Sequence, residues 1–170
     1  MNVEILQIPS CPIACVHHIG QYEGITEAFE RLVAWMELHE VFAQSPKYLG
    51  IYWDNPAEVA VNKLRSDACC TLQAPILAEG DVRPGAIPAG TYVVAHHQGP
   101  YPTLDAAWAW IYDTWLPSSD LQLVDGIAFE LYLNDPEEVT PDQLRTDLYI
   151  PVIGQATKEF NPWGLGPLPF

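Results

Sequence analysis

The spacing of apolar residues predicts one helix in each half of the chain. In the first half they recur at three- and four-residue steps from Ile25 to Met36, and in the second half from Leu104 to Trp115. Short apolar runs that are typical of strands lie on either side of both helices. These runs cover residues 12–18, 47–53 and 66–73 in the first half and residues 90–97, 126–133 and 145–152 in the second.

The two halves also share short sequence blocks in the same order. The matched blocks are ACVHHIGQY (14–22) with VVAHHQGPY (93–101), IYWDNP (51–56) with LYLNDP (131–136), and KLRSD (63–67) with QLRTD (143–147). Because the offset stays at 79 or 80 positions, the blocks indicate an internal duplication. We expect an α+β fold in which a strand-helix-strand-strand unit occurs twice with pseudo-twofold symmetry. Antiparallel sheets and two main helices would surround a central cleft.

The duplication also sets the expected domain limits. A single domain would span residues 1–153, with repeat halves of about 1–80 and 81–153. Residues 154–170 have no counterpart in the first half and are rich in Gly and Pro. Their apolar side chains predict that this extension packs on the domain or on a partner subunit: Phe160, Trp163, Leu165, Leu168 and Phe170.

The paired histidines in the first matched block do not indicate a metal site. Neighbouring residues of a strand point to opposite faces, so neither His17 with His18 nor His96 with His97 can easily bind one ion. The glycines that follow, Gly20 and Gly99, are expected to permit a tight turn from strand to helix. The sequence therefore predicts no metal.

Composition and charge narrow the classes of protein. The chain has 170 residues, 49% of them hydrophobic, which is enough for a sizeable core. Its 22 acidic and 7 basic residues give a net charge of −15, which repels nucleic acid phosphates and favours cationic small molecules or basic protein surfaces. The sequence shows no signal peptide and no apolar run of about 18 residues for a membrane span. Four cysteines without paired Cys-x-x-Cys spacing favour reduced thiols in the cytoplasm.

Motifs for cofactor chemistry are missing from the sequence. We find no Ser-His-Asp spacing, phosphate loop or dinucleotide fingerprint, so no cofactor is expected. The repeated L-R-x-D segments are interpreted as structural ion pairs, Arg65 with Asp67 and Arg145 with Asp147.

The combination of motifs resembles a known family. It consists of H-x-G-x-Y, G-I-Y-W-D-N-P, L-R-x-D, H-x-G-P-Y, F-E-L-Y-L-N-D-P and Y-I-P-V. Together these segments, over about residues 3–153, resemble the GyrI-like small-molecule-binding family, whose domain is also the effector-binding part of some AraC-type and MerR-type multidrug regulators. The resemblance implies that Glu130 lies at the floor of an aromatic pocket for bulky cationic, often lipophilic, ligands. It also implies that Tyr149 lines that pocket.

The duplication supplies an independent reason to single out Glu130. This residue aligns with Gly50 of the first half, and it lies in an apolar strand, AFELYL, where an unpaired charge is costly. Strand alternation places Glu130 and Tyr132 on one face. The alternative is that this face is exposed to solvent and Glu130 is an ordinary surface residue. Candidate pocket walls are the aromatic residues Trp108, Tyr112, Tyr52, Trp53 and Tyr149.

Three functions remain open at the level of sequence. The leading hypothesis is a stand-alone domain that senses or sequesters a cationic or lipophilic compound, because the repeat leaves no residues for a DNA-binding helix-turn-helix. The second is a hydrolase of cyclopropanoid toxins, an activity of some GyrI-like proteins, with Glu130 as the base helped by Tyr149 or a Trp. The third is an acidic inhibitor of DNA gyrase, the partner of the family's namesake. We expect no direct nucleic acid binding and no membrane association, and a homodimer stays open.

Overall fold

The computed structural model describes residues 1–164, and these form two compact units. The first-repeat unit comprises residues 10–88 with residues 163–164. The second-repeat unit comprises residues 1–9 and 89–162. Leu165, Leu168 and Phe170, which we expected to pack on the domain, lie outside the described residues.

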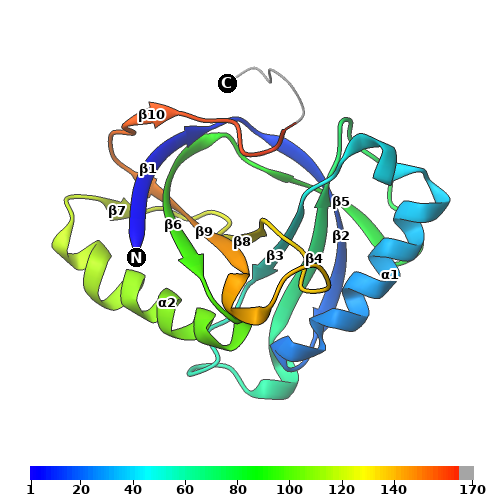
Figure 1. Cartoon of the computed structure of the whole chain (residues 1–170), viewed down its shortest axis with the longest axis horizontal. Helices are drawn as coiled ribbons and strands as arrows, with labels where there is room; N and C mark the ends of the chain where they lie inside the picture. Colours follow the sequence, from blue (N-terminus) through cyan, green and yellow to red (C-terminus); the bar gives the residue numbers. More distant parts are fainter. Residues whose placement is uncertain (165–170) are drawn as a thin grey trace. The chain divides into compact units, whose positions relative to one another are not determined.

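The first-repeat unit is a four-stranded antiparallel sheet with one helix (Figure 1). The strands run in the order β3-β4-β2-β5. Their bounds, with the helix, are β2 Cys11–Ile19, α1 Ile25–Leu38, β3 Tyr48–Tyr52, β4 Arg65–Thr71 and β5 Val82–Ile87. The buried face of α1, which includes Ala28, Leu32 and Met36, packs against Val16 and Ala68 of β2 and β4.

The second-repeat unit repeats this arrangement with added strands. Its sheet has the order β10-β1-β6-β9-β8, and β7 pairs separately with β9. The bounds are β1 Asn2–Ile8, β6 Gly90–Gln98, α2 Leu104–Trp110, β7 Gln122–Leu123, β8 Phe129–Tyr132, β9 Arg145–Ile153 and β10 Lys158–Glu159. After α2 the chain continues as a π-helical turn over Ile111–Trp115. The α+β fold with a duplicated strand-helix-strand-strand unit and two main helices is confirmed.

Within residues 1–164, four strands were not predicted from the apolar pattern: β1, β5 and the two-residue strands β7 and β10. The strand β1 pairs with β6, so it belongs to the second-repeat unit although it begins the chain. The strand β5 pairs with β2 and lies at the edge of its sheet. Its sequence, VRPGAI, contains Pro84 and Gly85, which are unfavourable inside a sheet and are tolerated on an edge strand.

The expected glycine turns are confirmed. Gly20 and Gly99 have φ values of 128° and 145°, a region that side chains rarely adopt. The Gly20 amide donates a hydrogen bond to the Leu64 carbonyl over 2.8 Å, and the Gly99 amide donates to the Leu144 carbonyl over 2.9 Å. The same backbone bond therefore closes the strand-to-helix turn in both repeats.

The arginine of the first repeat, Arg65, makes a different ion pair from the one expected. Arg65 binds Asp54 through Nη2 and Nε, over 2.8 and 3.1 Å. Asp67 instead accepts hydrogen bonds from Trp53 and His17. The predicted ion pair between Arg65 and Asp67 is therefore wrong, because Asp54, in the turn after β3, binds the Arg65 guanidinium instead.

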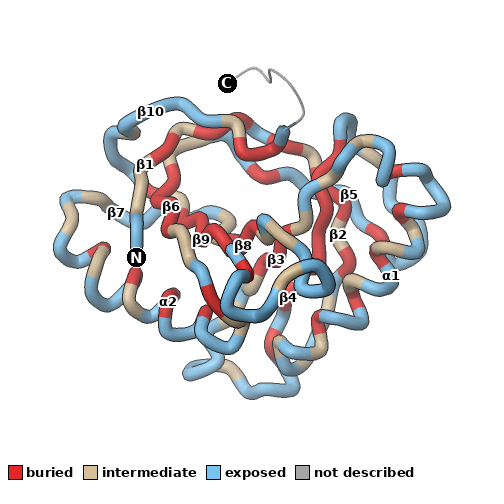
Figure 2. Tube along the Cα trace, viewed as in Figure 1, coloured by how far each residue is buried: buried red, intermediate tan, exposed pale blue. Residues whose placement is uncertain are grey.

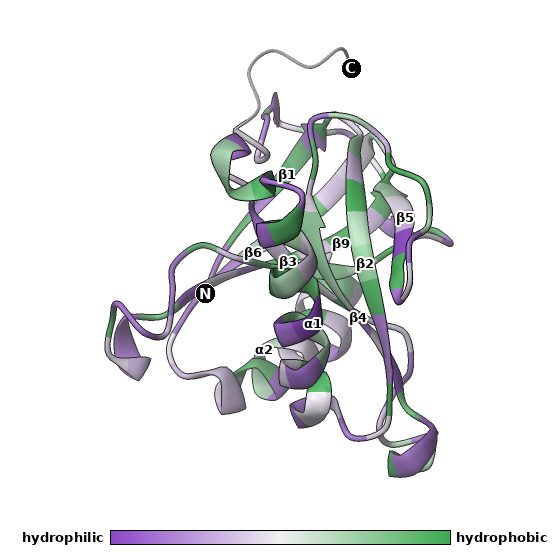
Figure 3. Ribbon diagram, turned by 90° about the vertical axis from the view of Figure 1, so that its right-hand side faces the viewer, coloured by the Kyte–Doolittle hydropathy of each residue, from purple (hydrophilic) through white to green (hydrophobic). Residues whose placement is uncertain are grey.

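Burial follows the sheets in both units. Figure 2 shows long buried stretches along β4, β6 and β9, and Figure 3 shows that much of β2 is hydrophobic. Part of the extension after residue 153 is also packed, because β10 pairs in parallel with β1 and Trp163 is fully buried. No helix within residues 1–164 is both long enough and apolar enough to span a bilayer.

Candidate functional site

Glu130 is a buried carboxylate in the middle of β8. The residue pairs in register with Leu148 of β9 and is only 5% exposed. Leu148 packs on the core beneath α2 together with Ala107 and Ile111, so Glu130 faces the same helix. The alternative of a solvent-exposed Glu130 does not hold in this structure.

Each oxygen of this carboxylate accepts one hydrogen bond from an aromatic side chain. Trp108 of α2 donates from Nε1 to Oε1 over 2.7 Å, and Tyr132 donates from its hydroxyl to Oε2 over 2.8 Å. The Tyr132 contact confirms that strand alternation places this residue beside Glu130. No Lys, Arg or His side chain within residues 1–164 forms an ion pair with Glu130.

The surroundings of Glu130 raise the pKa of its carboxyl above the ordinary value of a glutamate. Burial raises the pKa of the carboxyl above its ordinary value, the hydrogen bonds from Trp108 and Tyr132 lower it, and the charge of Asp105 raises it. The net direction is upward because no cation offsets the loss of water. A ligand cation would oppose this shift and favour the ionised form.

Further aromatic rings continue outward from the carboxylate. Tyr101 contacts Tyr132 edge-to-face, with ring centroids 5.7 Å apart. Tyr112, one helical turn after Trp108, stacks on the Trp108 ring at 6.0 Å with an interplanar angle of 17°. Of these two predicted pocket walls, Trp108 contacts Glu130 directly, and Tyr112 stacks on the Trp108 ring.

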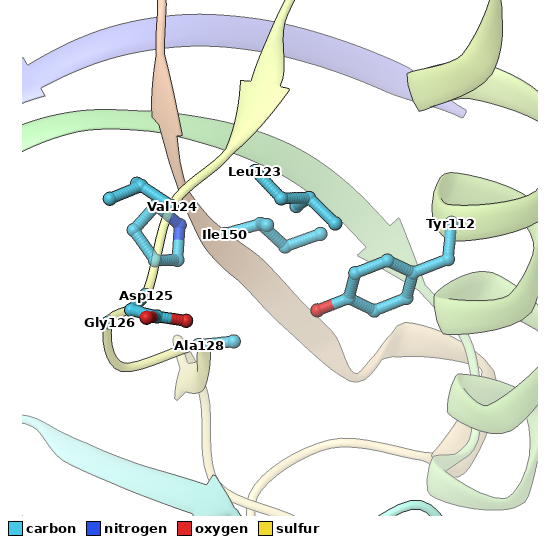
Figure 4. Close-up of a pocket in the computed structure, with 8 residues that line it drawn as sticks. Tyr112, Leu123, Val124, Asp125, Gly126, Ala128 and Ile150 are labelled. Atoms are coloured by element: carbon cyan, nitrogen blue, oxygen red, sulfur yellow. The ribbon is translucent and has the colours of Figure 1, made fainter.

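A pocket of about 250 Å³ opens beside Tyr112, within the second-repeat unit (Figure 4). Its lining includes Ile150 of β9 and Ala128, which directly precedes β8 and lies two residues before Glu130. The Tyr112 hydroxyl points across the pocket towards Ala128 and Asp125. The remaining lining residues are Leu123, Val124, Gly126 and Pro151.

The first repeat fills the corresponding space with side chains. At the aligned positions, Gly50 replaces Glu130, Phe29 replaces Trp108 and Tyr48 replaces Ala128. In the first-repeat unit the Phe29 and Tyr48 rings pack edge-to-face at 6.3 Å. The second repeat thus differs from the first by a carboxylate, an indole donor and a small residue beside the pocket.

Tyr149 lies on the other face of the sheet. It pairs with Phe129, whose side chain alternates with that of Glu130, and the two rings stack at 4.6 Å with an interplanar angle of 6°. Tyr92 adds edge-to-face contacts to both rings. The Tyr149 hydroxyl is buried without a hydrogen-bond partner among the described residues. The structure therefore does not bring Tyr149 to the carboxylate of Glu130.

The remaining candidate walls, Tyr52 and Trp53, belong to the first-repeat unit. Tyr52 contacts Tyr22 edge-to-face at 4.9 Å, and Trp53 donates from Nε1 to Asp67 over 2.6 Å. These contacts are structural within that unit. The residues that sequence reasoning missed are Tyr101, Ala128 and Asp125. For Ala128, the alignment with Tyr48 was a usable signal.

The chain is similar to known proteins in structure and in sequence. The C-terminal domain of EcmrR superposes with a TM-score of 0.70 at 19% identity, covering 91% of this chain and 98% of that domain. SAV2435, solved bound to tetraphenylphosphonium, superposes with a TM-score of 0.54 at 15% identity, covering 91% and 95%. A protein of Erwinia billingiae named DNA gyrase inhibitor is 33% identical over 159 residues, covering 89% of this chain and 97% of the relative.

The sequence comparison is decisive for the family. Residues 1–153 match the profile described as GyrI-like small molecule binding domain. The chain belongs to this family.

Proposed function

We propose that this chain binds bulky cationic aromatic molecules at the α2 face of the second-repeat unit, with Glu130 as the counter-charge. The observation that carries the proposal is a glutamate that is 5% exposed and has aromatic donors but no cationic partner among residues 1–164. A buried carboxylate without a cation is costly, and structures retain such groups chiefly where a ligand or reaction uses them.

The aromatic rings supply the second part of the binding energy. A cation above a Trp or Tyr face gains about 0.5–2 kcal/mol per ring. Tyr112 presents one such ring to the pocket and is 38% exposed, while Trp108 lies between Tyr112 and the carboxylate. A bulky aromatic cation would enter beside Tyr112, and its charge would reach Glu130 when the Trp108 indole turns aside.

Two further features support a cationic ligand. Asp125 lines the pocket with a carboxylate of its own, while Glu130 lies behind Trp108, and the chain as a whole carries a charge of −15. Among proteins of the same fold, SAV2435 was solved bound to tetraphenylphosphonium, a lipophilic cation that itself carries four phenyl rings.

The test is a calorimetric titration of tetraphenylphosphonium into the wild-type chain and into Glu130→Gln. The variant keeps the shape of the side chain and removes its charge, so affinity should fall about tenfold, equivalent to ~1.4 kcal/mol. Glu138→Gln, at an exposed position, is the matched control for a change in net charge and should bind like wild type.

A neutral ligand of related shape separates charge from shape. Triphenylphosphine oxide should bind the wild-type chain and Glu130→Gln with equal affinity. Equal affinity of both proteins for tetraphenylphosphonium would refute the role of Glu130.

A second candidate function is inhibition of DNA gyrase. It is favoured by the 33% identity to a relative of that name over 89% of this chain. An acidic surface could compete with DNA for a basic groove. A supercoiling assay with purified gyrase and excess protein tests it, and undiminished supercoiling at the highest concentration would exclude this function.

A further inference from the structure

Two cysteines of the first-repeat unit lie directly opposite each other on neighbouring strands. Cys15 of β2 pairs in register with Cys69 of β4, and their Sγ atoms are 3.2 Å apart. Residues opposite each other in antiparallel strands have Cα atoms about 4.5–5.5 Å apart, within the range that a disulfide spans. The two thiols are free in this structure.

The pair is absent from the second repeat. The positions that align with Cys15 and Cys69 are Val94 and Tyr149, which are paired in the same register. The thiol pair is therefore not required by the duplicated framework. The thiol pair belongs to the first-repeat unit and Glu130 to the second-repeat unit, so a role for the thiols does not depend on the proposed function.

The surroundings give the two sulfurs different roles. Cys69 is fully buried and donates its S–H to Cys15, while Cys15 is only partly buried. Burial raises the pKa of the Cys69 thiol well above its ordinary value, and the contact with Cys15 adds to this effect. Cys15 is thus the thiol that meets a reagent first, and Cys69 is held in place to react second.

The neighbouring edge strand leaves one side of Cys15 open. A Cβ atom at Gly85 of β5 would lie 3.2 Å from the Cys15 Sγ, so the glycine avoids a contact there. Arg83, paired with Cys15 across the same two strands, is exposed and supplies a cation beside it. Arg83 gives an acidic reagent a cationic partner beside Cys15, against the repulsion of Asp67 near Cys69 and of the negative charge of the whole chain.

We propose that Cys15 and Cys69 form a redox-active dithiol that reacts with low-molecular-weight disulfides carrying carboxylates. The Cys15 thiolate attacks one sulfur of the small disulfide, forming a mixed disulfide and releasing one small thiolate. Cys69 then loses its proton, attacks the Cys15 sulfur and expels the second small thiolate. The protein loses two electrons and two protons, and the reagent is reduced to two thiols.

The other two cysteines are poor competitors for this reaction. Burial raises the pKa of Cys11 to about 11 and that of Cys70 to about 12. Cys70 also points to the opposite face of β4, where it packs in the core against α1. Cys11 and Cys70 therefore serve as internal controls for the reaction of Cys15 and Cys69.

The test is incubation of the reduced full chain with oxidised glutathione, followed by mass spectrometry of the intact protein and of non-reduced peptides. Wild type should lose two of its four free thiols and yield a Cys15–Cys69 cross-linked peptide. Cys70→Ala should react in the same way. Cys69→Ala should stop at a stable mixed disulfide on Cys15. Cys15→Ala should form neither a mixed disulfide nor an intramolecular cross-link.

Two results would overturn the proposal. One is loss of two thiols in Cys15→Ala, and the other is a wild-type mixed disulfide on Cys15 that never closes. Because a buried substitution can impair folding, the wild-type chain should also be treated with phenylarsine oxide, which bridges close thiol pairs. One arsenic per chain that blocks later disulfide formation supports the pairing, and failure to bind arsenic counts against it.

Discussion

Trp108 donates its indole N–H to Glu130 over 2.7 Å, and this contact both stabilises the carboxylate and covers it. The indole supplies one of the two hydrogen bonds that partly offset burial. The same ring stacks on Tyr112, which lines the adjacent pocket. Access to Glu130 and stability of the ligand-free site are therefore linked through one side chain.

Replacing Trp108 by Phe, the residue at the aligned position 29, should test this link. The buried carboxylate would lose a donor, so the free energy of unfolding should fall by about 1–3 kcal/mol. The pKa of Glu130 should rise further, which a carbon-13 NMR titration of its carboxyl would measure. Trp110→Phe, on the same helix, is the control, and an equal pKa change in both variants would contradict the assignment.

Filling the pocket at Ala128 should abolish binding without unfolding the protein. Ala128→Tyr copies the first repeat, where Tyr48 occupies the aligned position. We expect tetraphenylphosphonium affinity to fall at least about tenfold, since the ring would occupy the 250 Å³ space, while the melting temperature changes little. Ala128→Ser should bind normally. Retained binding in Ala128→Tyr would place the ligand elsewhere.

Cation binding should weaken as the pH falls. The pKa of Glu130 is raised by burial, so its carboxyl takes up a proton at a higher pH than an exposed glutamate does. Since the cation requires the ionised form, affinity should be constant well above this pKa and decrease below it. Calorimetry in buffers of different ionisation enthalpy would detect the proton released on binding near the pKa. Glu130→Gln should show neither effect.

His96 should contribute stability that is lost at high pH. Burial lowers its pKa, but hydrogen bonds to Asp147 and Glu4, over 2.7 and 2.6 Å, outweigh this and raise it above the ordinary value. The contribution is complete below the unfolded pKa near 6.5 and disappears as the pH rises through the folded value. It should stay under about 1 kcal/mol because the group is partly exposed.

The measurement for His96 is chemical denaturation of wild type and His96→Gln across this pH range. The stability difference should shrink as the pH rises. His17→Gln, which removes the corresponding contact to Asp67 in the first repeat, is the matched control. A difference that grows with pH would contradict the assignment.

Hydrolysis by Glu130 predicts a different outcome from binding. Both carboxylate oxygens already accept hydrogen bonds, so a water could be activated only after Trp108 or Tyr132 moved away. We therefore expect a cyclopropanoid electrophile to remain intact with the wild-type chain, as followed by mass spectrometry. Turnover by wild type that is lost in Glu130→Gln would establish the enzyme instead.

The sequence by itself determined the duplication, the two helices, the glycine turns and the unusual position of Glu130. These features depend on local spacing and on comparing one half with the other, so they need no knowledge of tertiary contacts. The strands β1 and β5 were not predicted because the partner strands that stabilise them are specified elsewhere in the chain.

Only the tertiary structure decided which aromatic residues meet the carboxylate. The apolar pattern treats Trp108 and Tyr149 alike, but strand register places Tyr149 with Phe129, on the face that alternates away from Glu130. Likewise, the pocket exists because Ala128 lacks a ring that Tyr48 supplies in the other repeat. Contacts of this kind depend on packing between distant segments, which residue spacing alone does not encode.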